Sequence, residues 1–89
     1  MSYTANGVYT LKQKDNGPPA GSVYARGTAD GAVLTLGVRL DSGNIVDLFD
    51  GIISVPSDNT VHHGSLIELV VTISNAGAST DLEIQYAAH

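Results

Sequence analysis

The chain has 89 residues, with nine acidic side chains against four basic ones and a formal net charge of −5. The basic residues are spread along the sequence, and without a cluster to displace counterions from phosphates we expect no nucleic-acid partner. There are no cysteines, so disulfides and thiolate metal sites are excluded, and no apolar run approaches the roughly 20 residues of a membrane helix.

The length predicts one domain over residues 1–89, since the sequence contains no linker, internal repeat or low-complexity segment. A domain this small buries only roughly 60–65% of the surface that its unfolded chain exposes. Without disulfides, such domains usually gain stability by oligomerisation or by docking onto a larger body. The first ten residues lack the basic and apolar regions of a signal peptide, which predicts synthesis as a soluble cytosolic protein.

Apolar residues recur with a period of two, which is typical of strands, and no helical stripe persists. A short polar arm is expected over residues 1–6, followed by a first strand over 7–14. The loop at 15–22 contains Asn-Gly, which favours a turn, and Pro-Pro, which cannot donate to a ladder. A short second strand is expected at 23–29.

Residues 29–51 have the most regular pattern of the chain and predict a hairpin. Its turn is expected at 41–44, where glycine and asparagine tolerate a positive φ. Val46 and Leu48 continue the alternation in the second arm. The residues of the first arm that are expected to face the core are Ala32, Leu34, Leu36, Val38 and Leu40.

After the hairpin, the sequence predicts a brief strand at 52–55, a loop at 56–60, a long strand at 65–75 and a last strand at 81–87. The expected inward residues of the last two are Ile67, Leu69, Val71, Ile73, Leu82, Ile84 and Tyr86. Six to seven short strands with one contiguous apolar layer predict an all-β fold, a compact antiparallel β-sandwich or small barrel.

The polar residues predict no catalytic residue, no metal site and no cofactor, and hence a protein that is not an enzyme. His62 and His63 are adjacent, so in a strand their rings point to opposite faces and cannot chelate one ion. We interpret them as polar turn residues, with a site shared between copies as the alternative. Asp47 and Asp50 lie on opposite faces of a regular strand, and the chain has no DxDxDG loop and no GxSxG motif.

Several apolar residues fall opposite the main inward sets, on faces that should be polar: Val33, Ile45, Phe49, Leu66 and Val70. One explanation is that the strand registers differ, so that some of these side chains point into the core. The other is a surface patch that a soluble monomer would avoid, and hence a protein–protein interface.

The tyrosines suggest a further binding surface. Tyr3, Tyr9 and Tyr24 are candidates for a sugar-binding platform, whereas Tyr86 is expected to pack in the core. A small carbohydrate-binding module is therefore an alternative function.

Residues 27–86 resemble a recurring type of small tailed-bacteriophage virion protein. The segments that carry the resemblance are DGAVLTL, DSGNIVDLFDG, GSLIELVVTISNAGAS and DLEI. The resemblance implies a non-enzymatic capsid decoration or cement protein of β-sandwich type. Such proteins sit on the outer shell as trimers or other symmetric clusters, between major capsid proteins, and offer no catalytic residues to carry over.

The sequence and the resemblance together lead us to expect a decoration protein that is made in the host cytoplasm and located in the virion. Its partners would be the major capsid protein or other virion proteins, and further copies of itself, most plausibly as a trimer. We expect the contact in the apolar off-face set and in the N-terminal segment with Tyr3 and Tyr9. A tail or fibre adaptor of the virion is the alternative within the same class.

Overall fold

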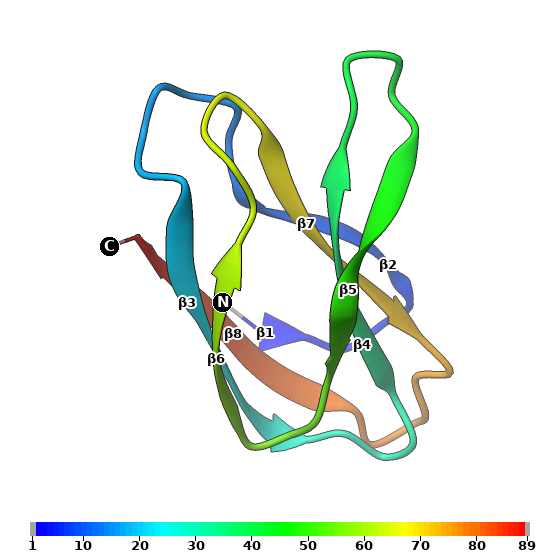
Figure 1. The fold of residues 1–89 in the computed structure, drawn as a ribbon. Coiled ribbons are helices and arrows are strands. Elements are labelled where there is room, and N and C mark those ends of the chain that lie inside the picture. Colours follow the sequence, from blue (N-terminus) through cyan, green and yellow to red (C-terminus); the bar gives the residue numbers. More distant parts are fainter. Residues whose placement is uncertain (1, 89) are drawn as a thin grey trace.

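The computed structural model describes the backbone of residues 2–88 and, within that range, all side chains except those of residues 49, 50, 57 and 59. The described chain forms strands and no helix, so it contains no helix long and apolar enough to cross a membrane (Figure 1). The strands are β1 (Ser2–Tyr3), β2 (Gly7–Lys12), β3 (Ala20–Thr28), β4 (Val33–Arg39), β5 (Ile45–Ile53), β6 (Ser57–His62), β7 (Glu68–Ser74) and β8 (Asp81–Ala88).

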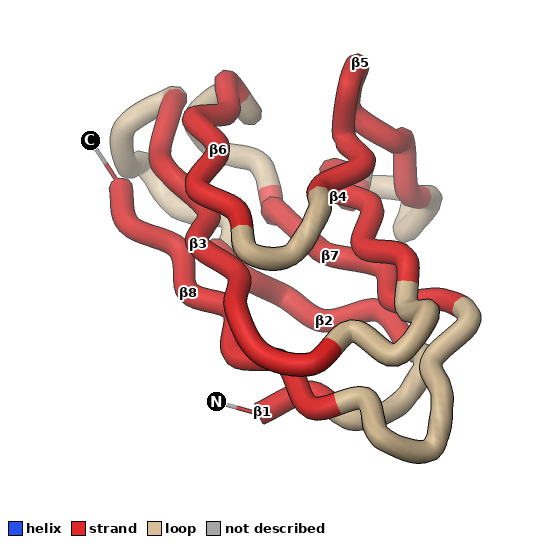
Figure 2. The backbone as a smooth tube through the Cα atoms, turned by 90° about the horizontal axis from the view of Figure 1, so that it is seen from below, coloured by secondary structure: helices blue, strands red, loops and turns tan. Residues whose placement is uncertain are grey.

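The strands form two four-stranded antiparallel sheets that lie as two layers (Figure 2). Sheet A has the order β1-β8-β3-β6 and sheet B the order β2-β7-β4-β5. Strand 1 therefore pairs with 8, 2 with 7, 3 with 6 and 4 with 5, which is the arrangement of an eight-stranded jelly roll. The predicted all-β sandwich is confirmed, with eight strands over the described residues rather than six or seven.

The core lies between the two sheets and is built by alternation along the central strands. Leu34 and Leu36 of β4 and Leu69 and Val71 of β7 are fully or almost fully buried, as the period-two pattern predicts. Each such side chain contributes about 1.5–3 kcal/mol when it leaves water. The other buried members of the cluster are Tyr3, Val23, Ala25, Ile53, Ile73, Leu82 and Ile84.

The segment after the hairpin differs from the prediction. Residues 52 and 53 complete β5 rather than forming a separate strand, and residues 57–60 of the predicted loop belong to β6. Among the described strands, β6 stands at one edge of sheet A and pairs with β3. Asp58, Thr60 and His62 are exposed, and Val61 packs against the core. An edge strand with so little apolar surface to bury carries no period-two signal in its sequence.

The N-terminal segment is not a free arm. Ser2 and Tyr3 pair with Glu83 and Leu82 of β8, and the Tyr3 side chain is buried in the core. Its ring meets that of Tyr9 edge to face, with centroids 4.7 Å apart. The expectation of an extended arm that contacts a partner is therefore corrected: Ser2 and Tyr3 form an edge strand of sheet A.

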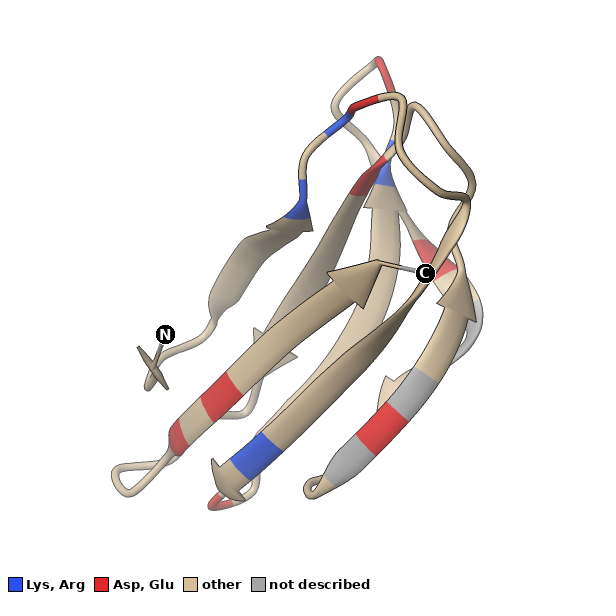
Figure 3. Ribbon diagram, turned by 90° about the vertical axis from the view of Figure 1, so that its left-hand side faces the viewer, with Lys and Arg blue, Asp and Glu red and all other residues tan. Residues whose placement is uncertain are grey.

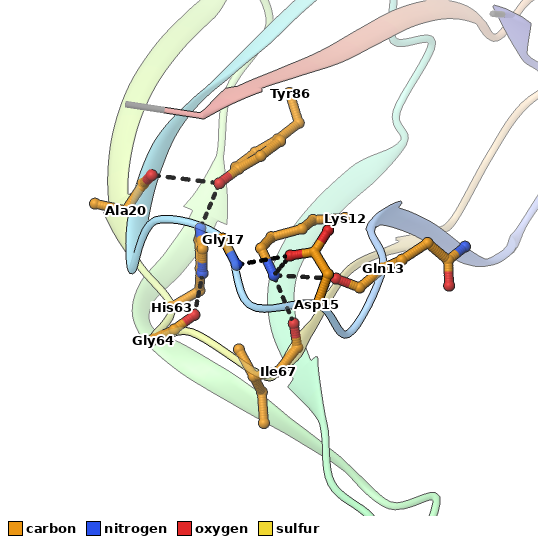
Figure 4. A network of polar contacts seen from close by, with 9 residues as sticks. All are labelled: Lys12, Gln13, Asp15, Gly17, Ala20, His63, Gly64, Ile67 and Tyr86. Carbon is orange, nitrogen blue, oxygen red and sulfur yellow. Dashed lines mark hydrogen bonds and ion pairs between the residues drawn. The ribbon is translucent and has the colours of Figure 1, made fainter.

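One end of the sandwich, at the top of Figure 1, carries the loops at 13–19, 40–44 and 63–67. A buried lysine, Lys12, joins two of these loops (Figure 4). Its Nζ lies 3.1 Å from Asp15 Oδ1 and donates to the carbonyls of Gln13 and Ile67 at 3.0 and 3.1 Å. Because burying an unpaired ammonium is costly, these acceptors are what allow Lys12 to close this end of the core.

His63 lies in the loop beside Gly64, as expected of a turn residue, but its side chain is buried and ties this loop to the last strand. Nδ1 donates to the carbonyl of Gly64 at 2.6 Å, and Nε2 lies 2.5 Å from the Tyr86 hydroxyl (Figure 4). That hydroxyl is also 3.3 Å from the carbonyl of Ala20, at the start of β3. His63 and Tyr86 together thus link β8, β3 and the loop that leads into β7.

Candidate protein-binding face

The outer face of sheet B carries a row of β-branched side chains that crosses all four strands. Val8 of β2 pairs with Thr72 of β7, Thr72 with Thr35 of β4, and Thr35 with Ile52 of β5. These positions alternate with core residues such as Val71 and Leu34, so their side chains point away from the core. With their neighbours on the same side they form what we call the β-branched face: Val8, Thr10, Val33, Thr35, Ile52, Val70 and Thr72.

Three aliphatic side chains of the β-branched face are open to solvent. Ile52 is 70% exposed, Val8 42% and Val33 38%. Valine, isoleucine and threonine favour strands, which accounts for their presence in a sheet. The solvated face of an antiparallel sheet is nevertheless usually polar. Here the aliphatic side chains of the face stay in contact with solvent, because no other part of the described chain covers them.

A hollow lies beside Ile52. Asp47 pairs with Gly37 and Ile52 with Thr35, so residues 48–51 of β5 stand opposite Leu36 alone. This bulge bends β5 away from the regular ladder. The resulting open hollow has a volume of about 560 Å³ and is lined by Thr35, Asp47, Leu48, Gly51 and Ile52. The hollow is open to solvent and has room for a side chain of a partner, whereas a regular flat sheet has no such depression.

Polar groups bound the β-branched face at the loop end. Glu68 of β7 lies between Arg39 of β4 and Thr10 of β2. Arg39 Nε is 3.3 Å from Glu68 Oε2, and the Thr10 hydroxyl donates to the same oxygen at 2.6 Å. An apolar centre with a polar boundary on one side is typical of protein–protein interfaces.

The predicted interface residues divide between this face, the core and other parts of the chain. Val33 lies on the face, and the partly buried Ile45 pairs with Arg39 at its boundary. Val70 also points to this side, between Thr10 and Gly37, but it has no exposed surface. Its assignment as a contact residue is corrected: Val70 forms the floor of the face.

The remaining predicted interface residues do not lie on the β-branched face or are not described. Tyr3 is in the core, and Tyr9 packs against it and donates its hydroxyl to the carbonyl of Ala5 at 2.8 Å, so neither is a free contact residue. Leu66 is exposed, but in the loop that precedes β7. The side chain of Phe49 lies outside the described residues.

Sequence reasoning named neither the three threonines of the face nor two of its exposed aliphatic members, Val8 and Ile52. Val8 alternates with Tyr9 in the predicted first strand, so the period-two pattern contained the signal. Ile52 could not be placed, because its orientation depends on the bulge at 48–51.

A second exposed apolar set lies on the inner side of the β4–β5 hairpin near its turn. Leu40 was predicted to face the core, and both Leu40 and Val46 are exposed. The hairpin stands up at the loop end of the molecule (Figure 1), and the ion pair between Lys14 and Asp41, at 2.6 Å, attaches its turn to the loop at 13–19. This tip is a candidate contact between copies.

The titratable groups whose pKa is shifted lie in ion pairs at the loop end or pack against the core. The hydrogen bond from Lys12 holds the pKa of Asp15 below its ordinary value, and Lys14 does the same for the pKa of Asp41. Burial raises the pKa of Tyr3 and of Tyr86. Across the described residues, no three His, Asp or Glu side chains gather in a group that could hold a metal ion.

Comparison of the chain with protein-family models, with curated proteins and with solved structures finds no match.

Proposed function

We propose that the chain is a structural component of a tailed-phage particle, a capsid decoration protein without enzymatic activity. In this proposal the β-branched face docks on the outer shell and bridges neighbouring major capsid subunits. The observation that carries the proposal is the exposed row from Val8 to Ile52 with the hollow beside it.

The energetics favour a surface that is used in many copies. Complete burial of one Val or Ile side chain stabilises an interface by about 1.5–3 kcal/mol. The binding free energy of one copy is therefore modest, because the burial of Ile52, Val8 and Val33 is partly offset by the entropic cost of association. When several linked copies dock together, the same contact becomes much stronger, so a symmetric cluster on a regular shell suits this face.

The fold and the charge are compatible with that role. Jelly rolls occur in viral capsid domains, and also in lectins and cupins, so the fold alone does not choose between functions. The net charge of −5 would place the protein outside the shell, away from packaged DNA. We place the contact between copies, with a trimer as the favoured state, at the hairpin tip around Leu40 and Val46.

Binding to purified shells that lack the protein tests the proposal. We expect the wild-type chain to sediment with the shells to saturation, and the Val8→Ser/Ile52→Ser double variant to bind at least about tenfold more weakly. The matched control is Tyr24→Ser, which removes an exposed side chain from sheet A and should bind like the wild type.

Equal binding of the double variant and the control would refute docking through the β-branched face. Binding of the wild-type chain to tails or fibres, and not to shells, would instead assign it as a tail or fibre adaptor.

A further inference from the structure

The outer face of sheet A differs in character from the β-branched face. Figure 3 looks onto this sheet, where acidic bands on β8 and β6 flank a basic band on β3. In the ladders, Tyr24 of β3 pairs with Gln85 of β8 on one side and with Asp58 of β6 on the other. One row across three strands therefore presents an amide, an aromatic ring and a carboxylate.

Tyr24 is 46% exposed although it lies in the middle of this sheet. Beside it is a hollow of about 450 Å³ that is open to solvent. The residues that line it are Tyr24, Ala25, Arg26, Pro56, Glu83 and Gln85. A concave surface that combines an aromatic ring with a few convergent polar groups is a typical small-ligand site.

The polar groups of the hollow are partly fixed and partly free. Arg26 Nε and Glu83 Oε1, paired across the β3–β8 ladder, are 2.6 Å apart, so each orients the other. Among the described residues, none makes a hydrogen bond to the Tyr24 hydroxyl or to the Gln85 amide. These two groups, with the unpaired oxygen of Glu83, can exchange hydrogen bonds with a ligand that carries several hydroxyls.

We propose that this hollow binds a neutral pyranose unit of a glycan. The apolar C–H face of the sugar stacks on the Tyr24 ring, and its hydroxyls meet Gln85, Glu83 and Arg26. The acidic surroundings of Glu83 and Asp58 disfavour sugars that carry a carboxylate. One ring gives weak, millimolar binding, which a cluster of copies would strengthen by avidity.

This inference does not depend on the proposed function, because it uses the opposite sheet. The two are compatible, since docking of the β-branched face on a shell would leave the outer face of sheet A pointing away from it.

Titration of the ¹⁵N-labelled protein with methyl glycosides of glucose, galactose, mannose and N-acetylglucosamine, followed by NMR, tests the inference. With at least one of these probes, we expect saturable shifts in the amides of residues 24–26 and 83–85. Tyr24→Ala should weaken the affinity at least about tenfold, whereas Tyr24→Phe, which keeps the ring, should stay within about threefold. Ile52→Ser, on the other face, is the matched control and should bind like the wild type.

Three results would overturn the inference. The first is the absence of saturable shifts with all four glycosides. The second is a Tyr24→Ala variant that binds as tightly as the wild type. The third is tighter binding of the methyl glycoside of glucuronic acid than of its neutral counterpart.

Discussion

Ile52 lies directly opposite Thr35 across the β4–β5 ladder, with most of its side chain in solvent. An aliphatic residue in this position adds little to the stability of the fold, because folding removes little of its apolar surface from water. Under the proposed function Ile52 serves binding rather than folding, and this separation can be measured.

We expect Ile52→Ser to change the free energy of unfolding by no more than about 0.5 kcal/mol, as is usual for surface substitutions. Urea unfolding followed by circular dichroism checks this. Ile53→Ser is the matched comparison, since Ile53 is the adjacent core residue, and it should cost about 2–5 kcal/mol. If Ile52→Ser were as damaging as Ile53→Ser, Ile52 would be a structural residue and the β-branched face would lose its most exposed member.

Gly21 makes room for the ring of Tyr86. A Cβ atom at position 21 would overlap the Tyr86 ring and hydroxyl, and the ring cannot move without breaking its hydrogen bond to His63. We therefore expect Gly21→Ala to destabilise the fold by about 1–3 kcal/mol. A double-mutant cycle with Tyr86→Leu checks the cause: most of the penalty should disappear when the ring is absent. A penalty that persists in full would show that the ring is not the obstacle.

Acid should weaken the loop end of the sandwich. The pKa of Asp15 and of Asp41 is lowered, first by the hydrogen bonds from Lys12 and Lys14. A lowered pKa in the folded state means that each pair stabilises the fold fully above the ordinary value of 3.8 and loses that contribution as the pH falls below it.

Unfolding measured in urea at several pH values from about 5 down to about 2 tests this. The stability of Asp15→Asn should fall less steeply with acid than that of the wild type. The effect is small because both carboxylates are largely exposed. Identical pH profiles for the two proteins would show that Asp15 does not contribute to the loss of stability in acid.

The hairpin tip should govern association between copies. We expect sedimentation equilibrium to give three times the 9.2 kDa mass of the chain, and Leu40→Ser/Val46→Ser to shift the equilibrium toward the monomer. Val8→Ser/Ile52→Ser should keep the wild-type mass, because its substitutions lie on the face assigned to the shell. A wild-type protein that stays monomeric at all concentrations would contradict a trimer formed in solution.

The sequence predicted those parts of the fold in which alternation and burial agree. β4 and β7 are central strands of sheet B, and each alternates between core residues such as Leu36 and Val71 and the outer face. The hairpin turn also carried its own signal in Gly43, whose φ of 93° few residues other than glycine adopt.

The remaining errors have physical causes that a period-two pattern cannot contain. Val70 faces outward and is still fully buried, whereas Leu40 follows the end of β4 and is exposed. His63 is buried because Tyr86, 23 residues away, reaches its ring. The burial or exposure of these side chains depends on packing between residues far apart in the sequence. Only part of the candidate site, chiefly Val33 and Ile45 at its boundary, could therefore be predicted from the sequence.

Electron cryomicroscopy of the intact virion, at a resolution that traces this sandwich, tests the central claim most directly. We expect density for the chain on the outer shell, with Val8 and Ile52 against the major capsid protein and Tyr24 facing the solvent. Density at the tail, contact with the shell through the outer face of sheet A, or the absence of the chain from the particle would contradict it.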